Sequence, residues 1–196
     1  MRKLSSILFI AAVGSQLGNT NCGEALRDPG YDLWCGDELC AWKVERGEIK
    51  RVPTWHEGDS GVELVGSDTA IAQLSPVDSG DGQCRDNDDG GTTCTSPDDV
   101  CLEITMLANI DEEAVVDLNL DVFNDGRIDH TQRLPISKWQ SLSYKVVVKQ
   151  PFAGIRFELA KSGSGTAQLA NIGAKLASNC DGLPRIDPGP APLGSP

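Results

Sequence analysis

The sequence predicts an all-β protein, a β-sandwich with disulfides and with irregular N- and C-terminal tails. Between residues 42 and 176, apolar and polar residues alternate in segment after segment, which is the pattern of strands with one wet face. Turn-forming residues separate about ten such segments. None of these segments has the apolar spacing of three and four that a helix requires. Two sheets packed face to face would bury the single apolar side of each strand.

Four short strands are expected before residue 75. Trp42 and Val44 alternate with charged residues in the first, and a turn follows at Gly47. Pro53 interrupts the second, which indicates a sheet edge or a strand end because proline cannot donate to the ladder. The predicted ranges are 41–46, 49–55, 62–65 and 70–74. Residues 75–100 are rich in Ser, Asp, Gly and Pro and predict a long loop.

A hairpin in the middle of the chain is the clearest local prediction. A strand over 101–107 precedes it, and the segment 114–123 has apolar residues at alternate positions. Asn124-Asp125-Gly126 then predicts a tight turn, because these residue types tolerate positive φ. Residues 127–134 return as the second strand.

Three more strands are expected towards the C-terminus, around Tyr144, Phe157 and Ile172. Residues 135–140 are interpreted as a connection, and Trp139 within it as a residue of the core or its rim. In the last strand, one parity is apolar and predicts a continuous core-facing side: Ala170, Ile172, Ala174 and Leu176.

Residues 1–21 are predicted to be a signal peptide. Two basic residues precede an apolar stretch over 4–13, and small and polar residues follow. The stretch is too short for a permanent membrane-spanning helix, which needs ~20 residues. The segment also resembles a bacterial lipoprotein signal with Cys22 as the lipidated residue, although Thr20-Asn21 depart from the small residues usual there. Both interpretations stay open, and both predict export: secreted, periplasmic or lipid-anchored at the cell envelope.

The seven cysteines predict disulfides. Cys22 lies outside the predicted fold and is the natural odd one, so the other six would form three disulfides in an oxidising compartment. These are Cys35, Cys40, Cys84, Cys94, Cys101 and Cys180. Sequence does not fix their connectivity. Our first choice closes the short loop from Cys35 to Cys40, with Cys84–Cys94 and Cys101–Cys180 as the other pairs; a rival set joins Cys40 to Cys180.

The chain is therefore divided into four parts. Residues 1–21 form the signal peptide, 22–40 an irregular lead-in with Cys35 and Cys40, and 41–180 the sandwich domain. Residues 181–196 are rich in Pro and Gly and are predicted to be a disordered tail.

Charge and motifs disfavour several functions. The formal net charge of −12 repels nucleic acid phosphates and anionic lipid headgroups, so we expect no nucleic-acid partner and membrane contact only through a lipid anchor. The sequence has two histidines and lacks Gly-x-Ser-x-Gly, a phosphate loop and His-Glu-x-x-His. We predict no enzyme. A small glycoside hydrolase with two carboxylates is the less favoured alternative.

Several segments resemble the carbohydrate-binding jelly rolls of the galactose-binding-domain-like group. The segment 42–47 resembles their first strand, 62–66 with 70–73 their early hairpin, and 154–159 with 166–172 their closing pair. The resemblance implies a jelly-roll sandwich and a carbohydrate ligand. The whole chain is also similar to uncharacterised lipoproteins of Gram-negative bacteria, which implies a place in the bacterial cell envelope.

Two candidate sites follow. Trp55, His56 and Asp59 combine an aromatic ring, which could stack on a sugar, with polar neighbours; packing of Trp55 in the core is the favoured alternative. Asp86, Asp88 and Asp89 concentrate oxygen ligands that suit calcium, the one cofactor considered, although an exposed acidic loop explains them better.

The expected function is an exported, non-catalytic module that binds carbohydrate or another envelope protein. The alternative is a structural or protein-interaction lipoprotein without a small-molecule site.

Overall fold

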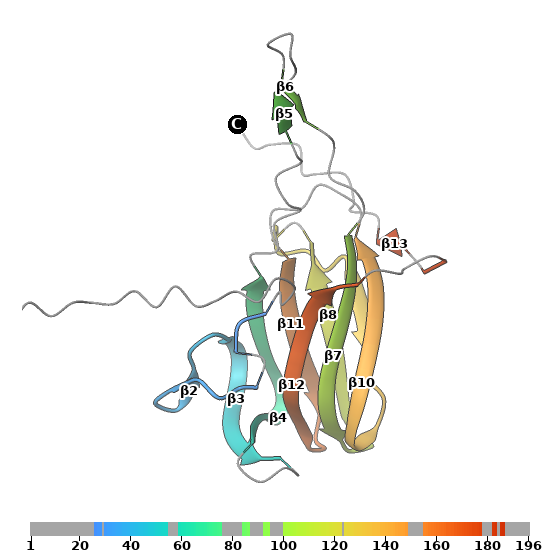
Figure 1. Cartoon of the computed structure of the whole chain (residues 1–196). Helices are drawn as coiled ribbons and strands as arrows, with labels where there is room; N and C mark the ends of the chain where they lie inside the picture. The colour runs from blue at the N-terminus through green and yellow to red at the C-terminus, as the bar shows by residue number, and fades with distance from the viewer. Residues whose placement is uncertain are drawn as a thin grey trace, which may run out of the picture.

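The computed structural model describes residues 26–28, 30–54, 59–75, 84–86, 92–94, 100–122, 124–148, 155–177, 182–183 and 185–186. Their regular structure consists of β-strands, as predicted (Figure 1). In these ranges there is no helix with the length and hydrophobicity to cross a membrane. The predicted signal peptide, the lipid-anchor residue Cys22 and the end of the predicted tail from residue 187 lie outside them.

Nine strands form two packed leaves of one continuous sheet, which is antiparallel apart from a short parallel pair at one edge. In the described residues, β1 with β2 and β5 with β6 form two separate two-stranded sheets. The first leaf orders β10-β7-β12 against the first half of β4, and the second orders the other half of β4 against β11-β8-β9. Figure 1 shows β12, β7 and β10 in front of β11 and β8. The strands are β3 (Lys43–Pro53), β4 (Ser60–Ser75), β7 (Val100–Ile110), β8 (Ala114–Asp121), β9 (His130–Arg133), β10 (Ser137–Val148), β11 (Ile155–Gly163) and β12 (Ala167–Leu176). The short ones are β1 (Trp34–Cys35), β2 (Glu38–Leu39), β5 (Cys84–Asp86), β6 (Thr92–Cys94) and β13 (Arg185–Ile186).

The β3–β4 ribbon joins the leaves. The start of β4 pairs with β12, whereas its end pairs with β11, and β3 accompanies both halves along the other side. The β3–β4 register shifts on both sides of Arg46, next to Gly47 with a φ of 72°. A side chain on Gly47 would overlap Thr69, so this corner requires glycine. Strands commonly pass from one sheet to the other through such bulges.

The core lies between the leaves and confirms the predicted alternation. In β11, for example, Ile155, Phe157 and Leu159 are fully buried. The inward-facing residues of the facing strands have the same character: Leu102, Ile104, Met106, Ala108 and Ile110 in β7, and Ala114, Val116, Leu118 and Leu120 in β8. Burial of these side chains is the main favourable contribution to folding.

The last strand has a bulge that the sequence did not predict. Ala167 and Leu169 face the core, and the buried parity then changes to Ile172 and Ala174. The register with β7 shifts between Ala170 and Gly173, so β12 carries an extra residue there. The predicted apolar parity is confirmed for Ala170, Ile172 and Ala174, which are all buried; the bulge brings Ala167 and Leu169, of the other parity, into the core as well.

The central hairpin is real, but its turn is not tight. Strand β8 pairs with β9 from Asp117↔Arg133 to Leu120↔His130, which leaves a wide loop. The carboxylate of Asp121, which is fully buried, accepts hydrogen bonds from the backbone N–H groups of Asp125 (3.2 Å) and Gly126 (2.8 Å). Asn124 and Gly126 do have positive φ. The prediction of positive φ at this turn is therefore confirmed. The loop is wider than a two-residue turn, and the carboxylate of Asp121 binds its backbone from within.

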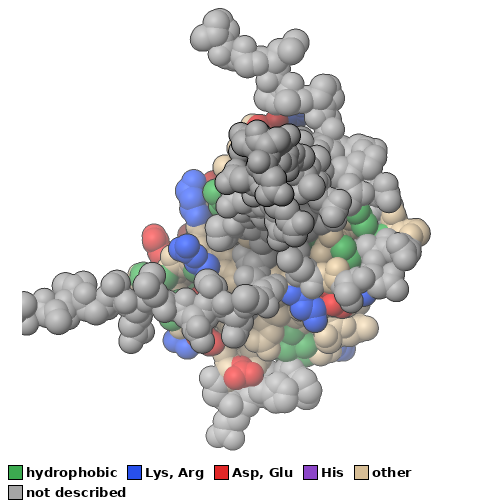
Figure 2. Space-filling model, turned by 45° about the horizontal axis from the view of Figure 1, so that its top comes forward, with side chains coloured by type: hydrophobic (Ala, Val, Ile, Leu, Met, Phe, Trp, Pro, Cys, Tyr) green, Lys and Arg blue, Asp and Glu red, His purple; other side chains and the backbone are tan. Residues whose placement is uncertain are grey.

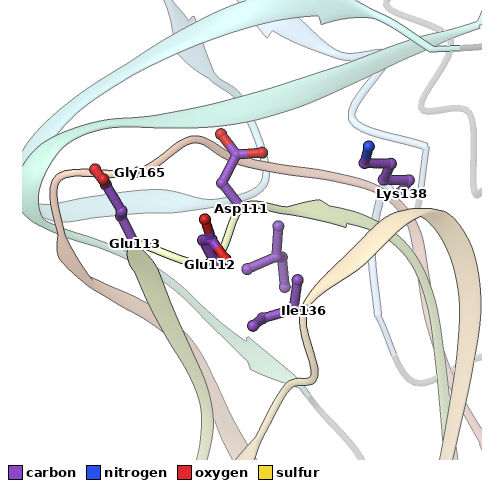
Figure 3. A pocket seen from close by; sticks show the side chains of 7 residues that line it. Asp111, Glu112, Glu113, Ile136, Lys138 and Gly165 are labelled. Atoms are coloured by element: carbon purple, nitrogen blue, oxygen red, sulfur yellow. The ribbon is translucent and has the colours of Figure 1, made fainter.

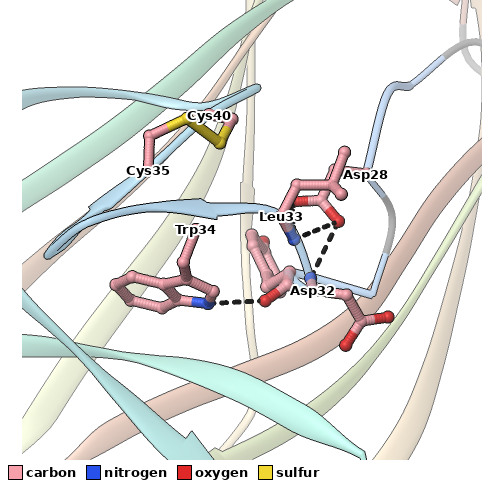
Figure 4. The surroundings of a disulfide bond; sticks show 7 residues. Asp28, Asp32, Leu33, Trp34, Cys35 and Cys40 are labelled. Carbon is pink, nitrogen blue, oxygen red and sulfur yellow. Dashed lines mark hydrogen bonds between the residues drawn. A yellow bond between two sulfur atoms is a disulfide. The ribbon is translucent and has the colours of Figure 1, made fainter.

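The lead-in packs against the core of the sandwich. Tyr31 and Leu39 belong to the hydrophobic core, and the Tyr31 ring lies 5.5 Å from that of Trp42. The predicted Cys35–Cys40 disulfide is confirmed. Figure 4 shows the local hydrogen bonds: Trp34 Nε1 donates to the Tyr31 carbonyl, and the Asp28 carboxylate accepts from the two backbone N–H groups of Asp32 and Leu33.

The other predicted disulfides are only partly visible. Cys84 and Cys94 lie directly opposite each other in the β5–β6 pair, but their side chains lie outside the described part. Cys101 is disulfide-bonded. The rival Cys40–Cys180 pairing is wrong, because Cys40 is bonded to Cys35. The Cys101–Cys180 pairing stays a prediction, because Cys180 lies outside the described residues.

Candidate functional site

A row of polar side chains crosses the outer face of the first leaf. Lys50, Glu63, Gln168 and Asn109 are successive neighbours in register across β3, β4, β12 and β7. Lys50 Nζ lies 2.7 Å from Glu63 Oε1, Gln168 Nε2 donates to Glu63 Oε2 (2.7 Å), and Asn109 Nδ2 donates to Gln168 Oε1 (2.8 Å). We call these four residues the polar ladder. Each member is fixed by the next, so its free donors and acceptors point from defined positions.

Glu63 carries the negative charge of the ladder. Burial disfavours its ionised form, but the hydrogen bonds from Lys50 and Gln168 outweigh that effect and hold the pKa of Glu63 below its usual value. The ladder therefore keeps a carboxylate next to an ammonium group at neutral pH. Together with the two amides it offers both donors and acceptors.

Trp139 lies beside the end of the ladder. The β10–β7 register shifts between Ser137 and Gln140, so two residues, Lys138 and Trp139, stand opposite Asn109. Trp139 has a φ of 44°, which is uncommon for a bulky residue and costs conformational energy. Its side chain is half-buried but is not among the partly buried hydrophobic residues that pack against the described core. Bulges commonly redirect a side chain next to a functional site.

A hollow of about 450 Å³ adjoins this bulge at the end of the leaf (Figure 3). It is lined by Ile110, Asp111, Glu112, Glu113, Ile136, Lys138 and Gly165. Ile136 is 64% exposed. The hollow thus offers an apolar side chain and charged groups close to the bulge of Trp139.

The three carboxylates of the hollow do not form a facing pair. They follow one another on a single turn, while Lys138 and Ile136 lie on the other side (Figure 3). Asp111 Oδ2 accepts the backbone N–H of Thr166 (3.1 Å), and Glu113 Oε2 accepts the Ser164 hydroxyl (3.0 Å). Glycoside hydrolysis uses two carboxyl groups that flank the bond from different sides. Within the hollow this arrangement favours binding over hydrolysis.

Most residues of the two sites predicted from sequence lie outside the described part of the chain. Trp55 and His56 lie outside the described residues. Asp59 is exposed, and its carbonyl accepts the Thr54 N–H (3.2 Å) at the start of β4. Asp88 and Asp89 also lie outside, and Asp86 is described only through its backbone in β5. The described residues contain no group of three or more His, Cys, Asp or Glu that could hold a metal ion.

Sequence reasoning missed Trp139 and the ladder. Residues 135–140 were expected to be a connection, whereas β10 begins at Ser137. Trp42 is buried in the core as predicted, but Trp139 is only half-buried. No local pattern predicts a positive φ at a tryptophan, and the ladder depends on strand pairing between distant segments.

Comparison with known proteins gives a fold and no family. No family model matches the sequence, and no curated protein matches it. Among solved structures, TmCBM61 in complex with beta-1,4-galactotriose matches with a TM-score of 0.50 at 11% identity, over 77% of this chain and 97% of that chain.

Two further structures match less well. A family 16 carbohydrate-binding module has a TM-score of 0.48 at 12% identity, over 68% of this chain and 89% of its own. The CBM22-1 xylan-binding domain from Paenibacillus barcinonensis Xyn10C has a TM-score of 0.44 at 12% identity, over 71% and 88%. The likeness to TmCBM61 shows a jelly-roll sandwich, the fold that the sequence predicted, and at 11% identity it concerns the fold alone.

Proposed function

We propose that the protein is a non-catalytic carbohydrate-binding module whose ligand lies along the polar ladder and stacks on Trp139. The observation that carries the proposal is Trp139 itself, a strained, half-buried tryptophan on a β-bulge beside a hydrogen-bonded polar row. An indole face stacks on the apolar face of a pyranose ring, and fixed polar groups beside it bind the hydroxyls.

The ladder suits a neutral sugar chain. Its charges, Lys50 and Glu63, compensate each other at 2.7 Å, and the rest of the row consists of amides. Asn109 Oδ1 accepts no hydrogen bond from the described residues, so it is available to a ligand hydroxyl next to the bulge. A site of this kind selects by hydroxyl geometry and not by charge.

The fold supports the same proposal. TmCBM61, which shares the sandwich, was determined with a β-linked galactotriose bound. We infer that a β-linked neutral oligosaccharide is the first ligand class to test. The alternative of a protein-interaction module without a small-molecule site would leave the Trp139 bulge without a role.

We also propose that the protein acts outside the cytoplasm, at the cell envelope. The Cys35–Cys40 disulfide supports this, because disulfides persist in oxidising compartments. Mass spectrometry of the mature N-terminus in the native host tests it: removal of residues 1–21 is expected, and a retained Met1 would contradict export.

Calorimetric titration tests the binding proposal. Beta-1,4-galactotriose and a panel of neutral β-linked oligosaccharides are titrated into the purified mature chain. At least one is expected to bind. Trp139→Ala should weaken binding of that ligand at least ~10-fold, which is about 1.4 kcal/mol, because the pyranose ring loses the indole face on which it stacks.

Tyr144→Ala is the matched control. Tyr144 lies on the same strand, but its half-buried ring packs against the core. It should lower the thermal midpoint while the folded protein keeps its affinity. Absence of binding across the panel, or full affinity in Trp139→Ala, would contradict the proposal.

A further inference from the structure

A second hollow lies on the outer face of the other leaf. It has a volume of about 580 Å³ and is bordered by β3, β4, β11, the lead-in and the loop after β8. Ala72 and Leu74 of β4 contribute apolar surface to it, and Leu74 is 49% exposed. We call it the basic hollow, for the side chains Arg27, Lys43 and Arg156 that line it.

The sign of its charge is opposite to that of the protein. Three cations and one carboxylate, Glu45, line the hollow, whereas the whole chain carries a formal charge of −12. Lys43 Nζ forms an ion pair with Glu45 Oε2 at 3.1 Å, and its side chain is otherwise largely exposed, which leaves its other donors for a ligand. In the face shown in Figure 2, basic and acidic side chains are interspersed. Three cations around one concavity therefore stand out from the surrounding surface, and a concave cluster of one sign attracts ligands of the other.

Arg156 is held in place by acids at one side. One nitrogen, Nη2, lies 2.9 Å from Glu158 Oε2 and 3.5 Å from Glu45 Oε1. Its side chain is 20% exposed. Since both ion pairs use the same nitrogen, the other guanidinium donors remain for a ligand, and guanidinium groups bind carboxylates through paired, planar hydrogen bonds.

Arg27 is positioned by a buried side chain. The Gln73 amide accepts the Arg27 backbone N–H (2.7 Å) and donates to the carbonyl oxygens of Arg27 (3.0 Å) and Ala41 (2.8 Å). Gln73 is only 5% exposed. Within the described part of the chain no carboxylate pairs with Arg27. A fixed backbone that carries an unpaired cation at the rim is a preorganised anion site, because little ordering remains to be done on binding.

We propose that the basic hollow binds an acidic sugar, with the carboxylate of a uronic acid on Arg27, Lys43 and Arg156 and its ring over Leu74. The apolar floor favours a sugar ring over a bare anion, and the planar guanidinium favours a carboxylate. The site is separate from the polar ladder and stands whether or not Trp139 binds a neutral chain.

The test uses trigalacturonate as the probe and galactotriose as its neutral counterpart. The mature full chain is expected to bind trigalacturonate, with affinity that falls as salt is added. The double variant Arg27→Gln/Lys43→Gln removes two exposed cations and should weaken binding at least ~10-fold. Arg156→Gln is a second variant; circular dichroism shows whether it folds.

The matched control is Lys145→Gln/Lys175→Gln, which removes the same charge from exposed positions on the first leaf. It should keep its affinity for trigalacturonate, as should Trp139→Ala. An equal loss in this control would mean non-specific charge attraction and would overturn the proposal, as would absence of trigalacturonate binding by the unmodified chain. Loss of galactotriose binding alone would bear only on the Trp139 face.

Discussion

The two outer faces of the sandwich differ in chemistry although they belong to one continuous sheet. The face of the first leaf carries a polar ladder whose charges compensate, with a tryptophan on a bulge at its end. The face of the second leaf has the apolar side chains of Ala72 and Leu74 on β4 and a hollow lined by three cations. Between the leaves, both inner faces are predominantly apolar. In a strand the inward parity determines the fold, and the outward parity is free to determine the ligand.

The largest expected effect is that of a core substitution, which destabilises the whole sandwich and with it both outer faces. Phe157 is fully buried between the leaves, and Phe157→Ala is expected to lower the free energy of unfolding by about 3–5 kcal/mol because it leaves a cavity. Urea denaturation measures the change. Ile136→Ala, at a position 64% exposed, should alter stability by less than about 0.5 kcal/mol. Equal effects would show that the interior is not organised as described.

Loss of the lead-in disulfide should affect ligand binding at one face and not at the other. Cys35→Ser/Cys40→Ser opens a short loop and is expected to lower the free energy of unfolding by about 2 kcal/mol. Cys40 lines the basic hollow, so trigalacturonate binding should weaken, while binding at Trp139 should persist because that bulge belongs to β10. Calorimetry on the folded variant measures both. Parallel losses at the two faces would contradict their independence.

The strain at Trp139 can be measured by comparing two substitutions. Alanine and glycine both remove the ring, but glycine adopts a φ of 44° without penalty. Trp139→Gly should therefore be more stable than Trp139→Ala by about 1 kcal/mol, and neither should bind the neutral ligand. Thermal unfolding distinguishes them. If alanine proved the more stable of the two, the left-handed backbone at this bulge would be refuted.

The smallest effect concerns pH at the ladder. The pKa of Glu63 is lowered in the folded protein, so the ladder adds stability that is complete above the usual pKa and disappears as the pH falls through the lowered value. Glu63→Gln should be less stable than the unmodified chain by under ~1 kcal/mol at about pH 6, because Lys50 is largely exposed. The difference should shrink towards about pH 3. Urea midpoints across this range test the sign, and a difference that grows on acidification would contradict it.

Features of this molecule that depend on residues close together in the sequence could be predicted, whereas features that depend on pairing between distant segments could not. Alternation is local, so the core positions of β8 and β11 could be predicted residue by residue, and so could the short Cys35–Cys40 loop. The bulges at Trp139 and Asn171 could not, because each arises from register with a strand far away in the sequence. The basic hollow joins Arg27, Lys43 and Arg156 through the bent ribbon and the lead-in. These residues are far apart in the sequence, so no sequence pattern predicts that they lie around one hollow.

The corner at Gly47 has a consequence for polymers. Because one ribbon turns from the first leaf into the second, the outer surfaces of the leaves face away from each other across the core. A single glycan lying on one surface cannot also lie on the other. A monomer with both surfaces occupied would connect two different polysaccharide chains, one neutral and one acidic, and so would act as a crosslink between them without raising the affinity for either.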